Sequence, residues 1–366
     1  MRFPECSGEW EMSSIGEQFE LYSGNTPSRM NKNQFDGSIN WITSGELKEH
    51  YISDTKEKIS EEAAKNNSLK LLPVGTFVIA IYGLEANGVR GTCSITTRES
   101  TISQACMAFT SKMDIQNEFL YSWYKKHGNI IGIKYAQGTK QQNLSYDIIE
   151  RFNISYPCME EQKKLIRFIS LIDQRIATQN KIIYKLKSLI RGIAQNMVHR
   201  GKPNVRLSDC MICNSSTLQE SEVLESGTYP VYGANGIVGY LDCYATLNEA
   251  IYIIKDGSGV GTVFYVAGKC SAAGTLNTLQ AKEGYSLQYL YYLLTVFNFE
   301  PYKTGMAIPH IYFKDYGKAK VFCPSHSEQF KYTKLLSTID SKLLAEQNAL
   351  VNYNLQKQYL LRQMFI

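Results

Sequence analysis

The chain has 366 residues, of which 44% are hydrophobic and 20% are charged, and this composition excludes an intrinsically disordered protein. The length is sufficient for two or three packed domains. No run of 18 apolar residues occurs, and the first residues, MRFPECSGEW, lack the apolar core of a signal peptide, so we expect a cytoplasmic protein. Its cysteines should then be reduced, and the close pair Cys210 and Cys213 lacks a second pair of zinc ligands, so we expect no metal site.

The first part of the chain, residues 1–157, is expected to form a globule rich in strands. Within it, LLPVGTFVIAIYGLEANGVRGT (Leu71 to Thr92) predicts a strand, a turn that contains glycine and a second strand. Further on, GTKQQNLSYDIIERFNISYP (Gly138 to Pro157) predicts a loop led by glycine, a short polar or helical step, and a strand that ends at proline. We take these residues as the first domain.

A long helix is predicted next, over residues 158–199, and a related one over residues 325–366. Each follows a proline and has a shared Glu-Gln pair in its first residues, and the two copies are 167 residues apart. Apolar residues recur at alternating spacings of four and three, which is typical of the heptad seam of a coiled coil. The residues expected to pair the helices are Ile172, Ile176, Ile183, Leu186 and Ile190 in the first, and Ile339, Leu343, Leu350 and Leu360 in the second.

Polar residues fill the remaining seam positions of both helices. These are Gln179 in the first helix, and Glu346, Tyr353 and Lys357 in the second. Polar groups in a seam cost stability but can fix its register. We therefore expect the two helices to pair in one defined register.

A second globule is expected between the helices, over residues 200–324. There, two segments repeat the order of elements predicted for the two segments of the first globule. The first is NEAIYIIKDGSGVGTVFYVAG (Asn248 to Gly268), with a strand, a glycine turn and a second strand. The other is GMAIPHIYFKDYGKAKVFCP (Gly305 to Pro324), with a loop led by glycine, a short polar or helical step and a strand that ends at proline. The glycines between Asp256 and Gly261 do not predict a phosphate site, because a strand rather than a helix is expected after them. A tight turn is the expected structure.

The order globule, helix, globule, helix indicates an internal duplication of the α+β class. We expect two tandem mixed α/β domains, joined by two long antiparallel coiled-coil helices with pseudo-twofold symmetry. Each helix would be about 60 Å long, whereas the second globule should have a radius of gyration of about 14 Å. Such a body cannot easily carry the chain back along a helix, which favours antiparallel pairing within the chain. Pairing with another copy of the chain remains the alternative.

Charge is distributed unevenly between the globules and the helices. Residues 1–157 hold 16 basic and 18 acidic residues, and residues 203–324 hold 8 and 10. The helical segments are basic, with 10 against 3 in residues 158–202 and 5 against 3 in residues 325–366. This is not the profile of a protein held to a nucleic acid by bulk electrostatics alone. Nucleic-acid binding would still be possible if basic and amide side chains cluster on one face and a partner supplies further phosphate contacts.

The segments GTKQQNLS from Gly138, PCMEEQ from Pro157, YPVYGANGIVGY from Tyr229 and PSHSEQ from Pro324 occur in this order over essentially the whole chain. In this order the chain resembles the DNA specificity subunit of type I restriction-modification systems. The resemblance implies that each globule is a target recognition domain for one half of a split site in double-stranded DNA. It also implies that the helices act as a spacer and dock two methyltransferase subunits.

Further expectations follow from this resemblance. Restriction or translocase subunits should join the complex. S-adenosylmethionine, ATP and Mg²⁺ should be bound by the partner subunits, with no cofactor and no catalytic residue in this chain. The second loop, GMAIPHIYF from Gly305, departs from the glutamine-rich character of the first.

Candidate DNA-binding residues cluster first in the loop Lys140, Gln141, Gln142 and Asn143. Amide side chains can bind an adenine edge with two hydrogen bonds, and lysine can reach guanine or phosphate. A solvated polar loop is the alternative interpretation. The other candidates are Tyr82, Arg90, Tyr232, Asn235, Lys255 and His310.

Two other classes of function compete with DNA recognition. Asp36, Glu46 and Lys48 loosely imitate the carboxylate and lysine set of a nuclease, which would make the chain an enzyme in itself, although common residues at loose spacing arise often by chance. The third hypothesis is a protein scaffold whose helices bind partners and whose globules bind no nucleic acid.

Overall fold

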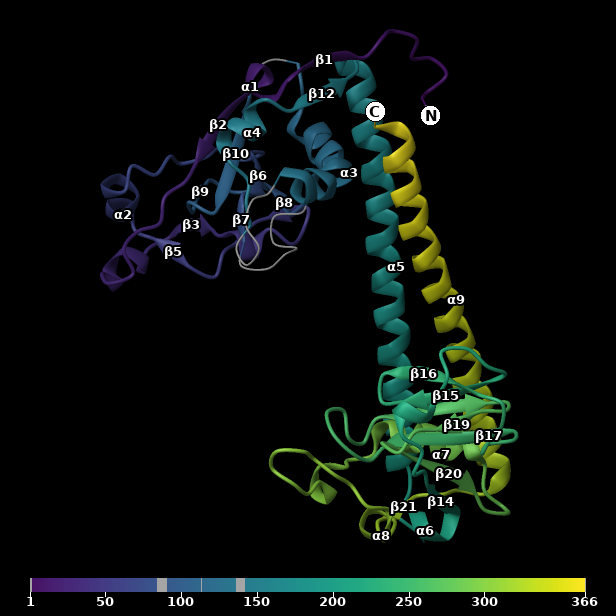
Figure 1. Cartoon of the computed structure of the whole chain (residues 1–366). Coiled ribbons are helices and arrows are strands. Elements are labelled where there is room, and N and C mark those ends of the chain that lie inside the picture. The colour runs from purple at the N-terminus through teal and green to yellow at the C-terminus, as the bar shows by residue number, and fades with distance from the viewer. Residues whose placement is uncertain (1, 84–90, 113, 136–141, 366) are drawn as a thin grey trace. The chain divides into compact units, whose positions relative to one another are not determined.

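The structure is a computed structural model that describes residues 2–83, 91–112, 114–135 and 142–365. The chain forms two compact units (Figure 1). The first unit consists of Met1–Thr178 together with Leu350–Ile366, and the second consists of Gln179–Ala349. Within the described residues, no helix has both the length and the hydropathy that a membrane span requires.

The first unit contains a five-stranded sheet in the order β2-β10-β6-β8-β4, a three-stranded sheet β5-β3-β9, and the pairs β1-β12 and β7-β11. Its strands are β1 (Glu11–Ser14), β2 (Phe19–Ser23), β3 (Ile39–Ile42), β4 (Tyr51–Ile52), β5 (Lys58–Ile59), β6 (Phe77–Ala80), β7 (Tyr82–Gly83), β8 (Cys93–Thr96), β9 (Ser100–Ile102), β10 (Cys106–Ser111), β11 (Gln142–Asn143) and β12 (Asn153–Tyr156). Its helices are α1 (Ile15–Gln18), α2 (Glu61–Asn66), α3 (Asn117–Tyr135) and α4 (Tyr146–Glu150), with 3-10 turns η1 (Lys32–Phe35) and η2 (Ser44–Glu46).

The second unit contains a four-stranded sheet in the order β14-β20-β17-β18, a three-stranded sheet β16-β15-β19, and the pair β13-β21. Its strands are β13 (Val205–Arg206), β14 (Met211–Ser215), β15 (Tyr229–Gly233), β16 (Gly236–Leu241), β17 (Glu249–Ile254), β18 (Val263–Ala267), β19 (Ser271–Ala272), β20 (Leu276–Ala281) and β21 (Lys320–Val321). Its short helices are α6 (Leu207–Cys210), α7 (Leu287–Val296) and α8 (Phe313–Tyr316), with 3-10 turns η3 (Glu220–Glu222) and η4 (Glu300–Tyr302).

The two units repeat one topology. In the first, β10 lies between β2 and β6, and β6 pairs with β8, all antiparallel; β14, β20, β17 and β18 repeat this arrangement in the second. In the smaller sheets, β3 and β15 each pair antiparallel with one neighbour and parallel with the other. The internal duplication expected from the sequence is therefore present in the fold, and β4 is an addition to the first unit.

The centre of the first unit explains why β6 reads as a continuous apolar run. Phe77 and Ile79 face one core cluster, which includes residues of α3, while Val78 and Ala80 face a second cluster with residues of β3 and β9. All four side chains are fully buried. Because both faces of the strand are covered, β6 lacks the alternation of apolar and polar residues that a half-exposed strand shows. The helix α3, the larger sheet and the smaller sheet form three layers.

The long helices are α5 (Met159–His199) and α9 (His326–Met364), and each contributes to both units. Leu165 at the beginning of α5 belongs to the core of the first unit, and Met197 at its end belongs to the core of the second. In α9 the order is reversed, with Leu336 in the core of the second unit and Met364 in that of the first. Each unit thus contains the beginning of one long helix and the end of the other.

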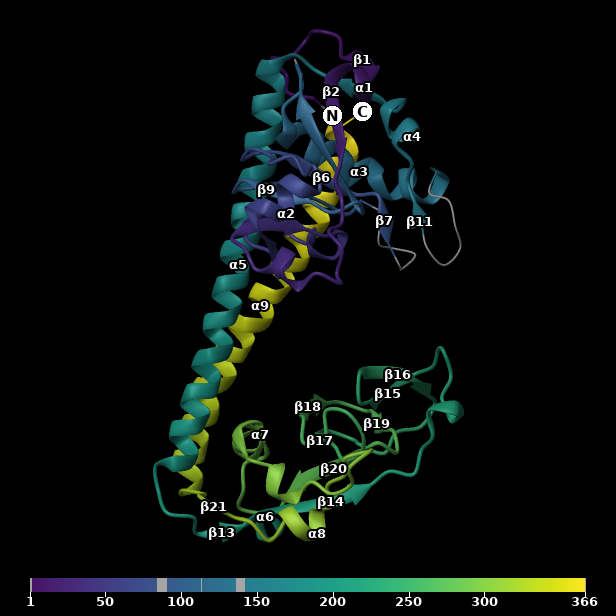
Figure 2. The same ribbon diagram turned by 90° about the vertical axis from the view of Figure 1, so that its left-hand side faces the viewer.

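The two helices run antiparallel within each unit (Figures 1 and 2). In the first unit, Asp173 binds Lys357, and Arg175 lies 4.9 Å from the ring centre of Tyr353. In the second, the Gln179 amide donates to the Glu346 carbonyl over 2.9 Å. The polar seam residues therefore meet polar or aromatic partners. The nine apolar seam residues all lie on the less exposed faces of the helices.

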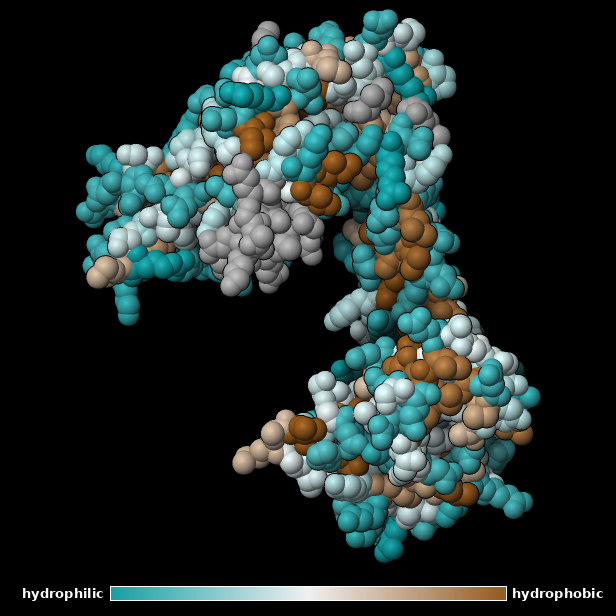
Figure 3. Space-filling model, in the orientation of Figure 1, coloured by the Kyte–Doolittle hydropathy of each residue, from teal (hydrophilic) through white to brown (hydrophobic). Residues whose placement is uncertain are grey.

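Both long helices also carry large apolar side chains on their exposed faces. Brown patches on the helices in Figure 3 mark hydrophobic residues of this kind. Leu171 and Leu189 of α5 and Leu344, Val351 and Leu355 of α9 are each about half exposed. These residues lie outside the predicted seam.

The repeated Pro-x-x-x-Glu-Gln segment has a structural role. The Gln162 amide donates to the Pro157 carbonyl over 3.0 Å, and its oxygen accepts from the Gln116 N–H over 3.0 Å, just before α3. Gln329 makes the same two bonds with Pro324 and with Ser286, just before α7, both at 2.9 Å. Both glutamines are buried. Each one fastens the beginning of a long helix to the beginning of a helix in its globule.

Candidate nucleic-acid interface

The first unit presents a short two-stranded edge made by β7 and β11. Tyr82 pairs with Asn143 across this edge, and the Leu144 N–H donates to the Ile81 carbonyl over 2.8 Å. Among the predicted DNA-binding residues, Arg90, Lys140 and Gln141 lie outside the described residues, and of Gln142 only the backbone in β11 is described. Tyr82 and Asn143 are thus brought together from segments 61 residues apart in the sequence.

A hollow of about 450 Å³ opens beside this edge. The described residues that line it are all uncharged: Ser23, Ile81, Tyr82, Gln104, Met107, Asn143, Leu144, Ser145 and Tyr146. Amides and hydroxyls of this kind can donate to and accept from base edges, while the buried Met107 gives an apolar floor. The hollow is the best candidate interface of the first unit.

Some of these residues were missed in the sequence. Ser145 and Tyr146 directly follow the loop that was singled out, so extending that loop by three residues would have found them. Gln104 lies in the turn between β9 and β10, and only the pairing of β10 with β6 brings it here. No local sequence signal pointed to it.

The second unit builds an equivalent edge from different side chains. Asp256 and His310 form a backbone bridge, and the Ile311 N–H donates to the Lys255 carbonyl over 2.9 Å, as Leu144 does to Ile81. The His310 Nδ1 atom lies 2.7 Å from the Asp256 carboxylate, which also pairs with the Lys255 ammonium. Two predicted residues, Lys255 and His310, are therefore held by a carboxylate that was not predicted.

The Asp256 carboxyl has a lowered pKa. Burial acts to raise its pKa, but the hydrogen bonds from His310 and Lys255 together outweigh that effect. Because the folded state favours the ionised form, this group stabilises the fold above the ordinary carboxyl pKa, and the contribution is lost as pH falls through the lowered value.

We therefore expect wild-type protein to lose its stability advantage over Asp256→Asn as pH falls from about 6 to about 3. Urea unfolding of both proteins across this range would measure the difference in free energy of unfolding. Asp242→Asn is a suitable control, since Asp242 is exposed on the same unit and its carboxylate accepts a hydrogen bond from the Thr228 hydroxyl. A constant difference at all pH values would show that Asp256 does not act through its charge.

The other two candidates of this unit lie on the smaller sheet. Tyr232 is half-buried in β15, with its ring 5.9 Å from that of Tyr252, and Asn235 is exposed in the turn before β16. Within the described part of the chain, neither residue forms a hydrogen bond, ion pair or ring contact with Lys255 or His310. The glycine run from Gly257 to Gly261 forms turns between β17 and β18, as the sequence predicted.

Glu46 of the loose nuclease set has a structural role in the fold. Its carboxylate oxygens accept hydrogen bonds from the backbone of Thr43 and of Lys56, at 2.9 and 2.7 Å, which ties the carboxylate to the η2 turn. Among the described residues, no three His, Cys, Asp or Glu side chains are grouped so that they could hold a metal ion.

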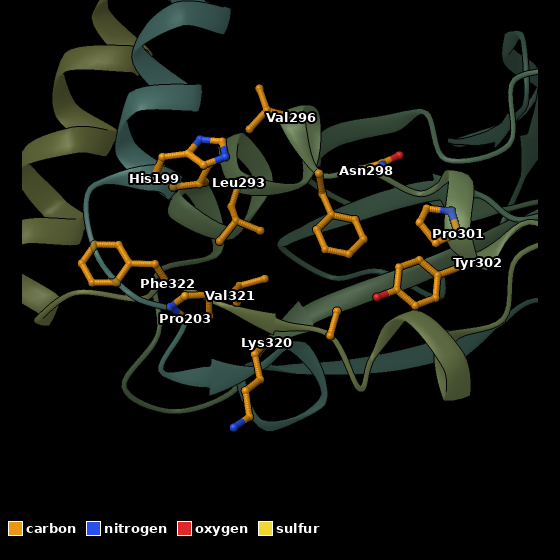
Figure 4. Close-up of a pocket in the computed structure, with 13 residues that line it drawn as sticks. His199, Pro203, Leu293, Val296, Asn298, Pro301, Tyr302, Lys320, Val321 and Phe322 are labelled. Carbon is orange, nitrogen blue, oxygen red and sulfur yellow. The ribbon is translucent and has the colours of Figure 1, made fainter.

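A separate hollow of about 450 Å³ lies in the second unit beside α7 (Figure 4). Leu293, Val296, Val321 and Phe322 give it an apolar lining, while the labelled Lys320 points away from it. A ligand site usually adds a few convergent polar groups to such a lining. The better candidates for recognition are therefore the paired edges, that is, the edge where Tyr82 pairs with Asn143 and the edge where Asp256 pairs with His310.

Two units of one topology, each exposing the same paired edge with different side chains, define a duplicated recognition protein. The model of the type I restriction modification DNA specificity domain matches this chain twice, over residues 7–188 and 202–353. The chain belongs to this family, as the resemblance in its sequence indicated.

Curated relatives include specificity subunits of type I restriction enzymes. The chain is 29% identical over 185 residues to the MjaIX specificity subunit of Methanocaldococcus jannaschii, a match that covers 49% of this chain and 42% of that protein. It is 27% identical over 170 residues to the EcoR124I/EcoR124II specificity subunit of Escherichia coli, covering 45% and 41%. The chain thus spans about two fifths of the length of these relatives. The EcoprrI specificity subunit of Escherichia coli is 22% identical over 370 residues, with 91% and 88% covered.

Solved structures show the same fold. The type I restriction-modification S subunit from M. genitalium superposes with a TM-score of 0.64 at 17% identity, covering 100% of this chain and 97% of that one. A chain from a structure that describes complex assembly of a type I R-M system gives a TM-score of 0.60 at 14% identity, covering 98% of both.

Proposed function

We propose that this chain is the sequence-specific DNA-recognition subunit of a type I restriction-modification complex, with one half-site read by each unit. The observation that carries the proposal is the double family match over two units that repeat one topology. The paired edges add support. Asn143 beside Tyr82 and His310 beside Asp256 occupy equivalent places, so the two units offer different chemistry and would read different bases.

The helices are the proposed docking surfaces for two methyltransferase subunits. Apolar side chains such as Leu189 and Val351 are exposed outside the seam, and an exposed apolar face commonly marks a protein contact. From Gln174 to Ser208 the chain has eight basic residues and no acidic one, which suits an acidic partner surface or DNA phosphate. Restriction or translocase subunits would join this assembly. S-adenosylmethionine, ATP and Mg²⁺ would be bound by the partner subunits.

The chain itself is proposed to be non-catalytic. Its uncharged hollow beside Tyr82 offers hydrogen bonds rather than a general acid, a base or a nucleophile set. A nuclease built on Glu46 is disfavoured because that carboxylate already accepts structural hydrogen bonds. A scaffold that binds no DNA would leave the two different paired edges without a purpose.

Methylation mapping tests the proposal directly. The chain should be expressed with the methyltransferase subunit of its own genome in a host without other methylation, and modified bases mapped across the host DNA. We expect one motif made of two short, different half-sites separated by unread bases. Omitting this chain should abolish the modification, and the chain alone with Mg²⁺ should leave DNA intact. An unsplit motif, or methylation without this chain, would contradict the proposal.

A further inference from the structure

Residues Thr304 to His310 form a closed loop on the second unit, here called the finger. Thr304 and His310 exchange two backbone hydrogen bonds, at 2.9 and 2.8 Å, which close the loop at its base. The same base is fastened to the paired edge, because the Gly257 N–H donates to the Pro309 carbonyl over 2.9 Å and Asp256 binds His310. The base of the finger is therefore fixed to the sheet.

Gly305 makes the closure possible. Its φ angle is +87°, a conformation that side chains disfavour, and a Cβ atom there would lie 2.4 Å from the Ile308 carbonyl oxygen. Only glycine lets the chain turn so tightly at this point. The shape of the finger is thus specified locally.

The tip of the finger is apolar and projects into solvent. Met306 is fully exposed and Ile308 is 57% exposed. In Figure 1 this segment is the yellow-green loop that extends from the second unit, and brown side chains cover a loop tip there in Figure 3. From Gly305 to Pro309 no side chain carries a hydrogen-bonding nitrogen or oxygen. The tip therefore cannot read a base edge by side-chain hydrogen bonds.

The first unit has the opposite chemistry at the same place in its sequence. At the repeat spacing of 167 residues, Met306 corresponds to Thr139 and Ile308 to Gln141. A polar loop would cost the fold less than an exposed methionine and isoleucine. The exposed apolar tip therefore calls for a contact outside this chain.

The sequence around the finger favours a polyanion. Residues 301–320 carry Lys303, Lys314, Lys318 and Lys320 but only one acidic residue, Asp315, in a globule that is otherwise acidic. Tyr312 is about half exposed, and the Lys314 ammonium lies 5.2 Å from its ring centre. The Lys303 pair with Glu300 is partly exposed, and such pairs are weak, so Lys303 can turn to a phosphate. An apolar tip whose base lies next to Lys303, and next to Tyr312 with its Lys314 neighbour, matches bases flanked by phosphates.

We propose that the finger enters a groove of the second half-site and that Met306 and Ile308 contact the apolar surface of bases there. That surface is either the methyl group of thymine in the major groove or the face of a base at an opened step. This inference rests on the proposed function and adds the means by which the second unit discriminates. Lys255 and His310 at the base of the finger would hold the adjacent phosphates.

The test uses the assembled complex with its methyltransferase subunits and duplexes that carry the mapped target. The variants are Met306→Asn, Ile308→Asn and the double substitution, which change only exposed side chains. Leu247→Asn is the matched control, because Leu247 is about as exposed as Ile308 and precedes β17, whereas the edge residue Lys255 follows β17. We expect the double variant to bind the target roughly 5- to 100-fold more weakly, with discrimination lost at one or two positions of the second half-site only.

Modified duplexes distinguish the two sources of apolar surface. If thymine methyl groups are contacted, replacing thymine by uracil in the second half-site weakens the wild-type complex but not the double variant. If a step is opened, 2-aminopurine placed there brightens with wild-type protein and not with the variant. Either response supports the proposal.

Two results would overturn the finger contact. One is binding and base discrimination by the double variant equal to those of wild type. The other is loss of the methyltransferase subunits from the complex, which would make the finger a protein contact. Equal urea midpoints of variants and wild type would confirm that folding is intact. Failure of the proposed function is separate, because it would appear as an absence of split-site methylation with the wild-type chain.

Discussion

Replacing Phe365 with alanine is expected to lower the free energy of unfolding of the first unit by about 3–5 kcal/mol. The Phe365 side chain is 1% exposed, and its ring centre lies 5.2 Å from that of Phe119 in α3. Its carbonyl also accepts a hydrogen bond from the Lys126 ammonium. Truncation would leave a cavity in a close-packed core, and the surroundings recover only part of the lost contacts.

The loss should be confined to the unit that holds Phe365. Cys93 is buried in the first unit and Cys270 in the second, so the rate of thiol labelling at each, read by mass spectrometry in mild urea, reports on the two units separately. Labelling of Cys93 should accelerate while that of Cys270 stays unchanged. Tyr359→Ala, at an exposed site of the same helix, is the control. Equal effects of both substitutions would show that the end of α9 does not complete this core.

Alanine at Gln162 or at Gln329 is expected to cost about 2–5 kcal/mol in the unit concerned. Each substitution removes one acceptor and one donor, and leaves a proline carbonyl and a backbone N–H unpaired in a buried place. Each such orphaned group costs about 1–3 kcal/mol. Gln162 also donates to the Asp114 carbonyl, a bond that Gln329 does not have, so the Gln162 variant should lose at least as much stability as the Gln329 variant.

Urea unfolding followed by circular dichroism would measure both glutamine variants. Gln195→Ala on the exposed face of α5 is the matched control. Glutamate at either site keeps the acceptor but loses the donor, so it should not restore stability. Losses no larger than that of the control would mean that the hydrogen bonds of Gln162 and Gln329 contribute little to stability.

The duplication could be predicted because its signals are local in sequence. A heptad seam, a proline before a helix and a glycine at a turn act within a few residues, so the spacing of 167 was visible without a structure. The burial of both glutamines after each proline was not visible, because their partners Gln116 and Ser286 lie more than 40 residues away. The same holds for the packing of Phe365 against Phe119.

The candidate interface was predicted in part for the same reason. Tyr82, Asn143, Lys255 and His310 lie on the paired edges, and residue type and position in the repeat were enough to select them. Gln104 and Asp256 were not selected. Gln104 reaches its hollow through strand pairing, and Asp256 acquires its role only by contact with His310, 54 residues away.

The division of the long helices between the units has a consequence for synthesis on the ribosome. The second unit is one continuous stretch, Gln179–Ala349, so all of its core residues emerge together. The first unit begins with Met1 but needs Leu350–Ile366 to fill its core. At about 5–20 residues per second, roughly 10–40 s pass between the emergence of Thr178 and that of Phe365. During that interval the surface that Phe365 will cover stays open, so the globule made first is the one completed last.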